Sequence, residues 1–401
     1  MSAALYIHIP FCEIRCGYCD FFTVTEHQAQ IPAYLGALAR EIELYCRDEA
    51  VRPLRFETLY LGGGTPSLLT PAQLSALLDV AFSRFTFVSN PEVTLEANPA
   101  TLSLPALRRL RSAGINRLSL GLQSFQAAEL GFLDRDHTVE QATTSFSDAR
   151  QAGFENLSID LIFALPEQSV RAWQTNLESA VALGPDHISA YTLTFENGTP
   201  LTALVRQGRI RPLPEQRQRR MQLAAIDYLQ DQGFVHYEIS NYARPGFESH
   251  HNQKYWDGSP YLGLGAAAHS YLGKKRFWNV RSLKGYLDSL SENKRPVAGD
   301  EVLDFDTLAF ERVYLGLRQR AGIHLHDFEA ETGTSLLKKY NKPLQKFFAC
   351  DFDDRATQSA LTKGQRTLKS RYLQIENGFL RLTRQGVLLC DAICAEFAQP
   401  E

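Results

Sequence analysis

Long apolar runs are absent from this 401-residue sequence, since none approaches the roughly 20 residues that a membrane-spanning helix requires. It also lacks a basic excess: 42 lysines and arginines stand against 45 aspartates and glutamates, giving a net charge of -3. That balance argues against a dedicated nucleic-acid binder, which usually carries a basic stripe. The opening residues, MSAALYIHIPFC, show no basic segment, apolar segment or cleavage site of a secretion signal. We therefore expect a cytoplasmic protein.

Short β-branched runs alternate with amphipathic segments through the first half of the chain. This alternation predicts βαβ units and a parallel sheet of the α/β class. Strands are expected near 4–10, 58–61, 92–97, 117–123, 157–163 and 187–195, and helices near 31–47, after 70, and near 105–112, 139–151 and 170–183. Six units fall short of the eight of a closed barrel, so we expect a partial (βα)6 barrel of the TIM type.

The rest of the sequence predicts further elements and a second, smaller domain. We expect a helix over 216–232, a last strand over 234–242, an ordered functional loop over about 250–280 and a linker at KRPVAGD, 294–300. Helical patterns follow over 305–317, 335–347 and 385–397, with a hairpin at Asn377-Gly378. The expected domains are a core over 1–295 and a small, mainly helical or winged domain over 300–401.

Three of the seven cysteines form a tight cluster, Cys12-x-x-x-Cys16-x-x-Cys19, after the first expected strand. Thiolates at this spacing can converge on one side of a loop and ligate separate irons of a cubane cluster. Three ligands for four irons leave one iron open. A structural zinc site is the main alternative, but it has no local fourth ligand, because Phe21 follows Asp20. The remaining cysteines read as helix residues without a metal: Cys46, Cys350, Cys390 and Cys394.

A glycine run and two carboxylates also follow or lie within expected strands. The segment Gly62–Pro66 (GGGTP) would let the backbone approach a ligand, and its amides could bind a carboxylate. Glu96 ends a strand and could pair with a ligand ammonium or accept a ribose hydroxyl. Asp160 lies inside a strand that looks buried, where a carboxylate needs a partner.

With Tyr18 before its last cysteine, the cluster motif resembles that of the radical S-adenosylmethionine (SAM) superfamily. Six segments resemble its oxygen-independent coproporphyrinogen III oxidase subfamily: YIHIPFC, LGGGTPS, LEANP, SLGLQSF, SIDLIFALPEQ and ISAYTLTFENGTP. The resemblance implies a radical SAM barrel and a 4Fe-4S cluster whose open iron is chelated by SAM. It also implies these cofactor contacts: Tyr6, Tyr18, Gly63, Gly64, Thr65, Glu96, Gln123, Arg135, Asp160 and Thr192.

Two functions share this scaffold: oxidative decarboxylation of coproporphyrinogen, and haem carriage by a chaperone. The decarboxylases have a further cysteine where Phe21 stands, and a longer N-terminal extension than the few residues before Cys12. The segment 251–256, HNQKYW, matches the HNxxYW motif of the haem chaperones. An imidazole can ligate haem iron, and aromatic rings can cover the porphyrin face. The match implies His251 as the candidate iron ligand and a haem pocket of Asn252, Tyr255 and Trp256, with His250 and His269 as alternative ligands.

We therefore expect a haem chaperone that carries a 4Fe-4S cluster, SAM and haem. It would transfer haem to acceptor haemoproteins, which could include respiratory-chain proteins, with at most peripheral membrane contact and no nucleic-acid partner. We also consider that two copies of the chain form a homodimer. Coproporphyrinogen oxidation is the alternative function, and we expect no such activity.

Overall fold

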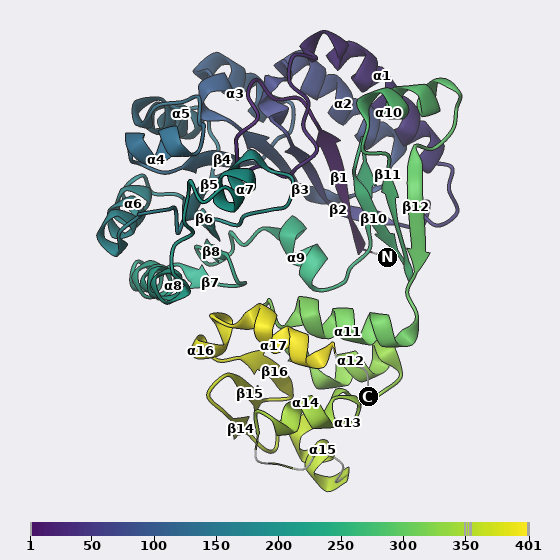
Figure 1. Ribbon diagram of the computed structural model, residues 1–401. Helices are drawn as coiled ribbons and strands as arrows, with labels where there is room; N and C mark the ends of the chain where they lie inside the picture. Colours follow the sequence, from purple (N-terminus) through teal and green to yellow (C-terminus); the bar gives the residue numbers. More distant parts are fainter. Residues whose placement is uncertain (1, 349, 351, 353–354, 399–401) are drawn as a thin grey trace. The chain divides into compact units, whose positions relative to one another are not determined.

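A computed structural model describes residues 2–348, 350, 352 and 355–398. The chain forms two compact units (Figure 1). The first contains the chain up to Val235 together with residues 240–254 and 259–301; the second contains residues 236–239 and 255–258 and the chain from Val302 onward. Among the described residues, every helix is too short or too polar to cross a bilayer.

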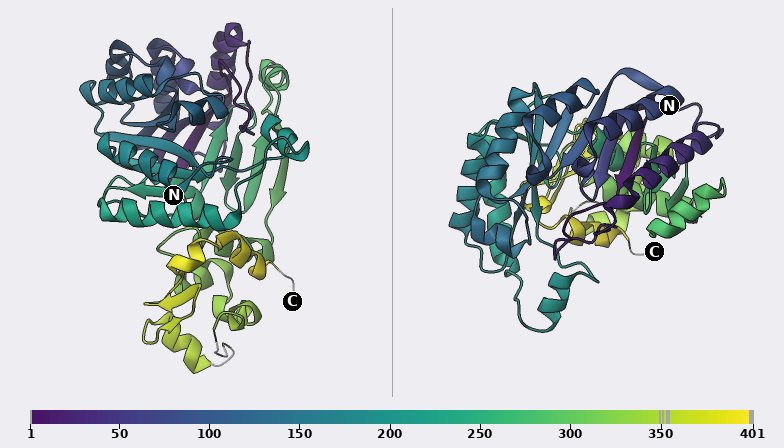
Figure 2. Two further views of the ribbon diagram at one scale, coloured as in Figure 1. Left: turned by 60° about the vertical axis from the view of Figure 1, so that its left-hand side comes forward. Right: turned by 90° about the horizontal axis from the view of Figure 1, so that it is seen from above.

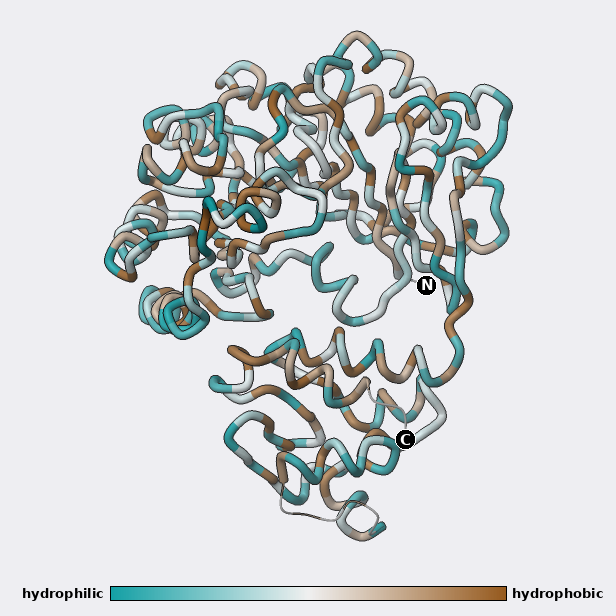
Figure 3. The backbone as a smooth tube through the Cα atoms, in the orientation of Figure 1, coloured by the Kyte–Doolittle hydropathy of each residue, from teal (hydrophilic) through white to brown (hydrophobic). Residues whose placement is uncertain are grey.

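Six parallel strands form the centre of the first unit and follow one another in chain order. They are β1 (Ser2–Ile9), β2 (Arg55–Gly63), β3 (Phe87–Ala97), β4 (Arg117–Gln123), β5 (Asn156–Phe163) and β6 (His187–Thr192). Most of their residues are buried, as expected for a parallel sheet covered by helices, and apolar stretches are visible along them (Figure 3). The sheet is open, which confirms the predicted partial barrel.

The helices between these strands lie along the outer face of the sheet (Figures 1 and 2). They are α1 (Ile31–Tyr45), α2 (Pro71–Arg84), α3 (Leu104–Ser112), α4 (Ala127–Phe132), α5 (Val139–Gln151) and α6 (Val170–Ala182), followed by α7 (Pro200–Arg206) and α8 (Glu215–Asp231). The indole of Trp173 on α6 donates to the Met221 carbonyl on α8 at 3.0 Å and is fully buried. This contact packs α8 beside α6.

Segments beyond residue 234 extend the sheet on both sides. The short strands β7 (Val235–His236) and β8 (Asn241–Ala243) follow β6, and β9 (Tyr261–Leu264), β10 (His269–Leu272), β11 (Lys275–Asn279) and β12 (Val297–Val302) continue beyond β1. The expectation of a loop over 250–280 is wrong: this region holds α9 (His250–Trp256) and three strands. The expected linker at 294–300 overlaps β12, because its residues complete the sheet after α10 (Leu283–Ser291).

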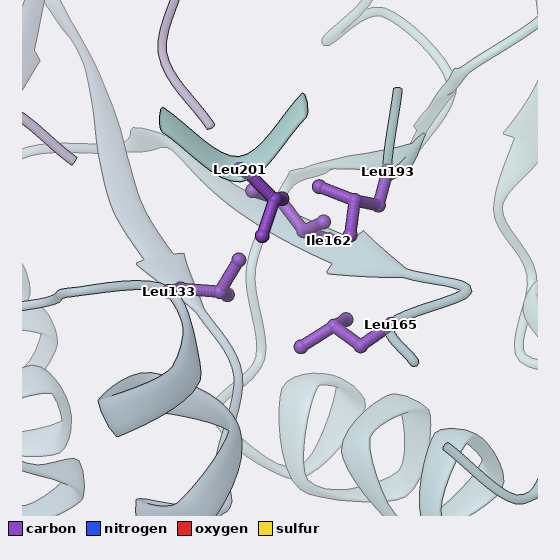
Figure 4. Packing of buried hydrophobic residues seen from close by; sticks show 5 residues of the cluster. All are labelled: Leu133, Ile162, Leu165, Leu193 and Leu201. Carbon is purple, nitrogen blue, oxygen red and sulfur yellow. The ribbon is translucent and has the colours of Figure 1, made fainter. Parts of the chain in front are cut away.

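An apolar cluster closes one end of the parallel strands (Figure 4). It consists of the buried side chains of Leu133, Ile162, Leu165, Leu193 and Leu201. Ile162 lies at the end of β5, Leu165 and Leu193 follow β5 and β6, and Leu133 follows β4 further along the chain. Leu201 lies at the start of α7, so the cluster lies at the carboxyl ends of the strands. Burial of such side chains contributes roughly 25 cal/mol per Å² of apolar surface.

The second unit combines short helices with a four-stranded sheet of order β13-β16-β15-β14. Its elements are α11 (Phe305–Gly316), β13 (Ile323–His324), α12 (Leu325–Thr332), α13 (Leu336–Lys339), α14 (Asn341–Gln345), α15 (Arg355–Thr362), β14 (Leu368–Lys369), β15 (Leu373–Glu376), β16 (Phe379–Leu382), α16 (Arg384–Val387) and α17 (Cys390–Phe397). The hairpin expected at Asn377-Gly378 is confirmed, with both residues at positive φ.

We predict that Thr138→Ala lowers the free energy of unfolding by about 1 kcal/mol, because it removes the N-cap of α5. The Thr138 hydroxyl accepts from the Gln141 amide at 3.2 Å, and the Gln141 side chain accepts from the Thr138 amide at 2.8 Å. Urea unfolding followed by circular dichroism measures the change. Thr143→Ala is the matched control on the exposed face of the same helix. An equal loss in both variants would contradict the capping role.

Candidate functional site

The cysteine loop leaves the sheet directly after β1. Cys12 is buried, with 8% of its surface exposed, whereas Cys16 and Cys19 are half-buried. The backbone amide of Cys12 donates to the Val24 carbonyl at 3.0 Å, and the Cys19 amide donates to the Cys16 carbonyl at 3.1 Å. None of the three cysteines forms a disulfide. Backbone hydrogen bonds therefore help to hold the loop without engaging its thiols.

The charges around these thiols fit an iron–sulfur cluster. The pKa of Cys12 is raised to about 11, mainly by burial and also by the neighbouring Cys19 and Cys16 thiolates, while the hydrogen bond from Thr65 opposes the rise. Burial also raises the pKa of Cys19. The hydroxyl of Thr65 donates to the Cys12 sulfur at 3.4 Å, and an Arg135 nitrogen lies 3.7 Å from the Cys16 sulfur. Crowded, buried thiols that resist ionisation are a donor set that a metal cation stabilises.

Tyr18 lies within this loop and packs against the apolar cluster of Figure 4. Burial raises the pKa of its hydroxyl well above the usual range. Gly17, beside it, donates its amide to the Asp134 carboxylate at 3.1 Å, and its carbonyl accepts from the Leu201 amide. The loop is thus anchored at the carboxyl ends of the parallel strands, where parallel α/β proteins place their active sites.

The glycine segment lies against the cysteine loop, but its amides are already bonded. Gly64 donates to the Ile9 carbonyl and Thr65 to the Phe11 carbonyl, each at 2.8 Å, while Gly63 donates to Glu96 at 3.0 Å. These amides are therefore engaged within the protein, and their binding of a ligand carboxylate stays a prediction. A side chain at Gly63 would meet the His8 ring at 2.4 Å, and its φ of +114° favours glycine.

Glu96, near the end of β3, is half-buried and bonded on both oxygens. One oxygen accepts from the Tyr60 hydroxyl at 2.8 Å and the other from Gly63. Burial raises the pKa of Glu96 to about 7; the two hydrogen bonds lower it, and the neighbouring Asp160 charge raises it. This carboxyl is poised to ionise when a cationic or hydroxyl ligand arrives.

Asp160 on β5 lies in the same polar interior. The Ser119 hydroxyl donates to its carboxylate at 3.2 Å, and burial raises its pKa, opposed by Ser189 and by the charge of Arg117. Arg117 at the start of β4 is 2% exposed, and among the described residues its Nε has no hydrogen-bond partner. The sequence reasoning missed Arg117, although an arginine opening an apolar strand is a detectable signal.

The remaining predicted cofactor residues also end or follow strands. Gln123 is the last residue of β4 and has a φ of +66°, a strained conformation for glutamine that is characteristic of functional sites. Arg135 donates to the Gly121 carbonyl at 3.0 Å, and its Nε lacks a partner among the described residues. Thr192 ends β6, whereas Tyr6 lies inside β1, where its hydroxyl donates to the His8 imidazole at 3.0 Å.

His251 on α9 is buried inside the first unit, with 1% of its surface exposed. Its Nδ1 lies 2.7 Å from the Thr58 hydroxyl, and its ring stacks on Tyr60 at 4.7 Å. Burial lowers its pKa to about 3, aided by the charge of Arg117. In this arrangement the imidazole faces β2 and is not exposed to a cargo. The alternative ligands His250 and His269 are exposed.

The predicted haem-pocket residues are divided between the two units. Asn252 is half-buried in the first unit, and its amide donates to the Ser249 hydroxyl at 3.3 Å. Tyr255 and Trp256 belong to the second unit, where the Arg318 guanidinium lies 5.8 Å from the Trp256 ring. Among the other cysteines, Cys390 and Cys394 lie in α17 and Cys46 caps α1, but Cys350 lies outside the helices.

Comparison with known proteins places both parts of the chain in known families. The radical SAM superfamily matches residues 6–180, and the HemN C-terminal domain matches residues 303–389. Membership of the radical SAM superfamily implies a 4Fe-4S cluster and SAM. The chain matches the structure of coproporphyrinogen III oxidase (HemN) from Escherichia coli with a TM-score of 0.77, 24% identity, and coverage of 98% of this chain and 89% of that one. This likeness confirms the fold.

Several curated relatives match over most of their length. The chain is 37% identical to the haem chaperone HemW of Bacillus subtilis, over 82% of this chain and 87% of that one. It is 39% identical to HemW of Mycobacterium tuberculosis, over 80% and 83%. It is also 32% identical to the mitochondrial radical S-adenosyl methionine domain-containing protein 1 of Danio rerio, over 98% and 86%. The chain therefore belongs to the HemW family of radical SAM proteins.

Proposed function

We propose that this protein is a haem chaperone, which binds haem and transfers it to acceptor haemoproteins. The observation that carries the proposal is its identity of 37–39% with proteins named haem chaperone HemW, over most of both chains. The HNQKYW segment at 251–256 supports it from the sequence. As further parts of the proposal, the protein works in the cytoplasm, its acceptors include respiratory-chain proteins that it meets only peripherally at the membrane, and it divides into domains at 1–295 and 300–401. The homodimer considered from the sequence stays a prediction.

The cluster would be held by Cys12, Cys16 and Cys19, leaving one iron for the cofactor. When bound, such a cluster supplies an electron to the sulfonium of SAM. The chain's own part is electrostatic. Thr65 donates to the Cys12 sulfur and so favours the thiolate form needed for ligation, and the Arg135 cation lies beside the Cys16 sulfur.

The cofactor would lie over the carboxyl ends of the strands. Ionised Glu96 would accept from its ammonium or ribose hydroxyls, and Asp160 would add a second acceptor. The unpaired Nε of Arg135 would serve a carboxylate. The other proposed contacts are Tyr6, Tyr18, Gly63, Gly64, Thr65, Gln123 and Thr192.

Haem ligation by His251 requires a movement of its imidazole. The imidazole would have to leave Thr58 and the Tyr60 ring before an iron could reach it, because it is 1% exposed where it lies. Asn252, Tyr255 and Trp256 would then contribute to the pocket. Exposed His250 is the neighbouring alternative, since it needs no such movement.

We predict that Cys12→Ser, Cys16→Ser and Cys19→Ser each reduce bound iron and acid-labile sulfide to background after anaerobic reconstitution, because each removes one iron ligand. Cys46→Ser is the control. Its thiol donates to the Glu43 carbonyl at the end of α1, away from the loop, so this variant should load fully. Full loading of a loop variant would contradict the ligand assignment.

We predict that SAM binding to the cluster-loaded protein strengthens as the pH rises from 6 to 7.5. Glu96, with a pKa of about 7 before the cofactor binds, is mostly neutral at the lower pH and mostly ionised at the higher one. The ionised form is the better acceptor, so affinity should rise about fivefold or more. Equilibrium dialysis measures it. Glu96→Gln should bind SAM weakly and show no such rise. If the variant keeps the pH dependence of the parent, Glu96 is not the group that titrates.

A paired assay of one anaerobic preparation separates the proposed function from coproporphyrinogen oxidation. We expect a Soret band on haem addition and no decarboxylated product from coproporphyrinogen with SAM and reductant. Comparing His250→Ala with His251→Ala then identifies the ligand. His251→Ala should lose haem affinity, and unchanged affinity would overturn that ligand. Product formation without haem binding would instead support the oxidase.

A further inference from the structure

We propose that His251 is a positioning residue of the cofactor pocket, which holds Tyr60 so that Tyr60 orients Glu96. The contacts form one continuous path. The imidazole stacks on the Tyr60 ring at 4.7 Å with an interplanar angle of 27°, and the Tyr60 hydroxyl donates to Glu96 at 2.8 Å. This inference rests on the proposed cofactor site and does not require haem carriage.

The strand register places these groups in successive layers. Thr58 and Tyr60 are two residues apart on β2, so their side chains share one face of the sheet. Tyr60 pairs with Thr94 on β3, which puts Glu96 one layer further toward the carboxyl ends. His251 bonds to Thr58, which precedes Tyr60 on β2 and so lies on the side of Tyr60 opposite to Glu96. Tyr60 is therefore held between the imidazole and the carboxyl.

Helix α9 is fixed so that its imidazole reaches this face. The Glu92 carboxylate accepts from the backbone amides of His250 and His251, each at 3.0 Å. The ammonium of Lys254 lies 2.6 Å from Glu57 and 2.7 Å from the Ser2 hydroxyl. These contacts attach the helix to β1 and β2 near their starts and to the middle of β3.

The electrostatics of the interior favour a neutral imidazole in this position. Arg117 lies close enough to act on Tyr60, Glu96, Asp160 and His251, so a second buried cation would be unfavourable. A neutral ring can stack on Tyr60 and bond to Thr58 without adding charge beneath the carboxyls. The role proposed for His251 is therefore one of geometry.

The test uses isosteric variants of the full, cluster-loaded chain, with SAM affinity from anaerobic equilibrium dialysis as the readout. Thr58→Val keeps the volume of the side chain but removes the hydroxyl that bonds to the Nδ1 of His251, so SAM affinity should fall about threefold to tenfold. Thr94→Val is the matched control. Its hydroxyl is buried on the neighbouring strand and, among the described residues, has no hydrogen-bond partner, so SAM affinity should stay within about twofold.

A double-mutant cycle tests whether the effect passes through Tyr60. Tyr60→Phe keeps the ring but loses the hydroxyl to Glu96. If His251 acts through Tyr60, adding His251→Ala to Tyr60→Phe should weaken binding less than His251→Ala does alone. Parent-like affinity in Thr58→Val, or purely additive losses in the cycle, would overturn the proposal. If His251→Ala fails to fold, the comparison of Thr58→Val with Thr94→Val still decides.

Haem titration of the same variants keeps the two proposals apart. Freeing the imidazole from Thr58 should leave haem binding intact or strengthen it. A Thr58→Val protein that loses SAM affinity but still gives a Soret band supports the positioning role and the chaperone together. Loss of SAM affinity without haem binding in the parent would leave the positioning role standing and remove the chaperone.

Discussion

The buried guanidinium of Arg117 sets the charge balance inside the parallel sheet. It is 2% exposed, and it lowers the pKa of Glu96 and Asp160, which burial alone would raise further. Burial keeps the His251 imidazole neutral by lowering its pKa, and the Arg117 charge lowers that pKa further. The Arg117 cation therefore acts on Glu96, Asp160 and His251 together.

The two motifs of the cluster region form one structural unit, although they lie about fifty residues apart in the chain. The amides of Gly64 and Thr65 bond to the carbonyls of Ile9 and Phe11, at the point where the chain enters the cysteine loop. A side chain at Gly64 would lie 2.7 Å from the Phe11 carbonyl. Glycine is therefore needed for packing against the loop, and the segment contributes to the cluster site by fixing the path of the chain toward Cys12.

Periodicity was enough to predict the regular elements, because their hydrophobic pattern is local. The predicted strand at 117–123 and helix at 139–151 match β4 and α5 residue for residue. The strands β9, β10 and β11 were not predicted, because the His, Asn, Tyr, Trp and Gly residues of this region carry no clear alternation. The burial of His251 could not be foreseen either. Its partner Thr58 is 193 residues away, and only the tertiary fold brings them together.

The His251 imidazole is 1% exposed between Thr58 and the Tyr60 ring, so an iron in a separate cargo cannot reach it while it stays there. If His251 both positions the cofactor pocket and receives haem, each ligand must change the affinity for the other, and by the same factor in both directions. At the other end of the motif, the Arg318 guanidinium lies 5.8 Å from the Trp256 ring within the second unit. Cofactor binding would then govern whether the His251 imidazole can leave its site and ligate haem. Such a coupling gives a physical reason for a haem chaperone to keep a cofactor site even without radical turnover.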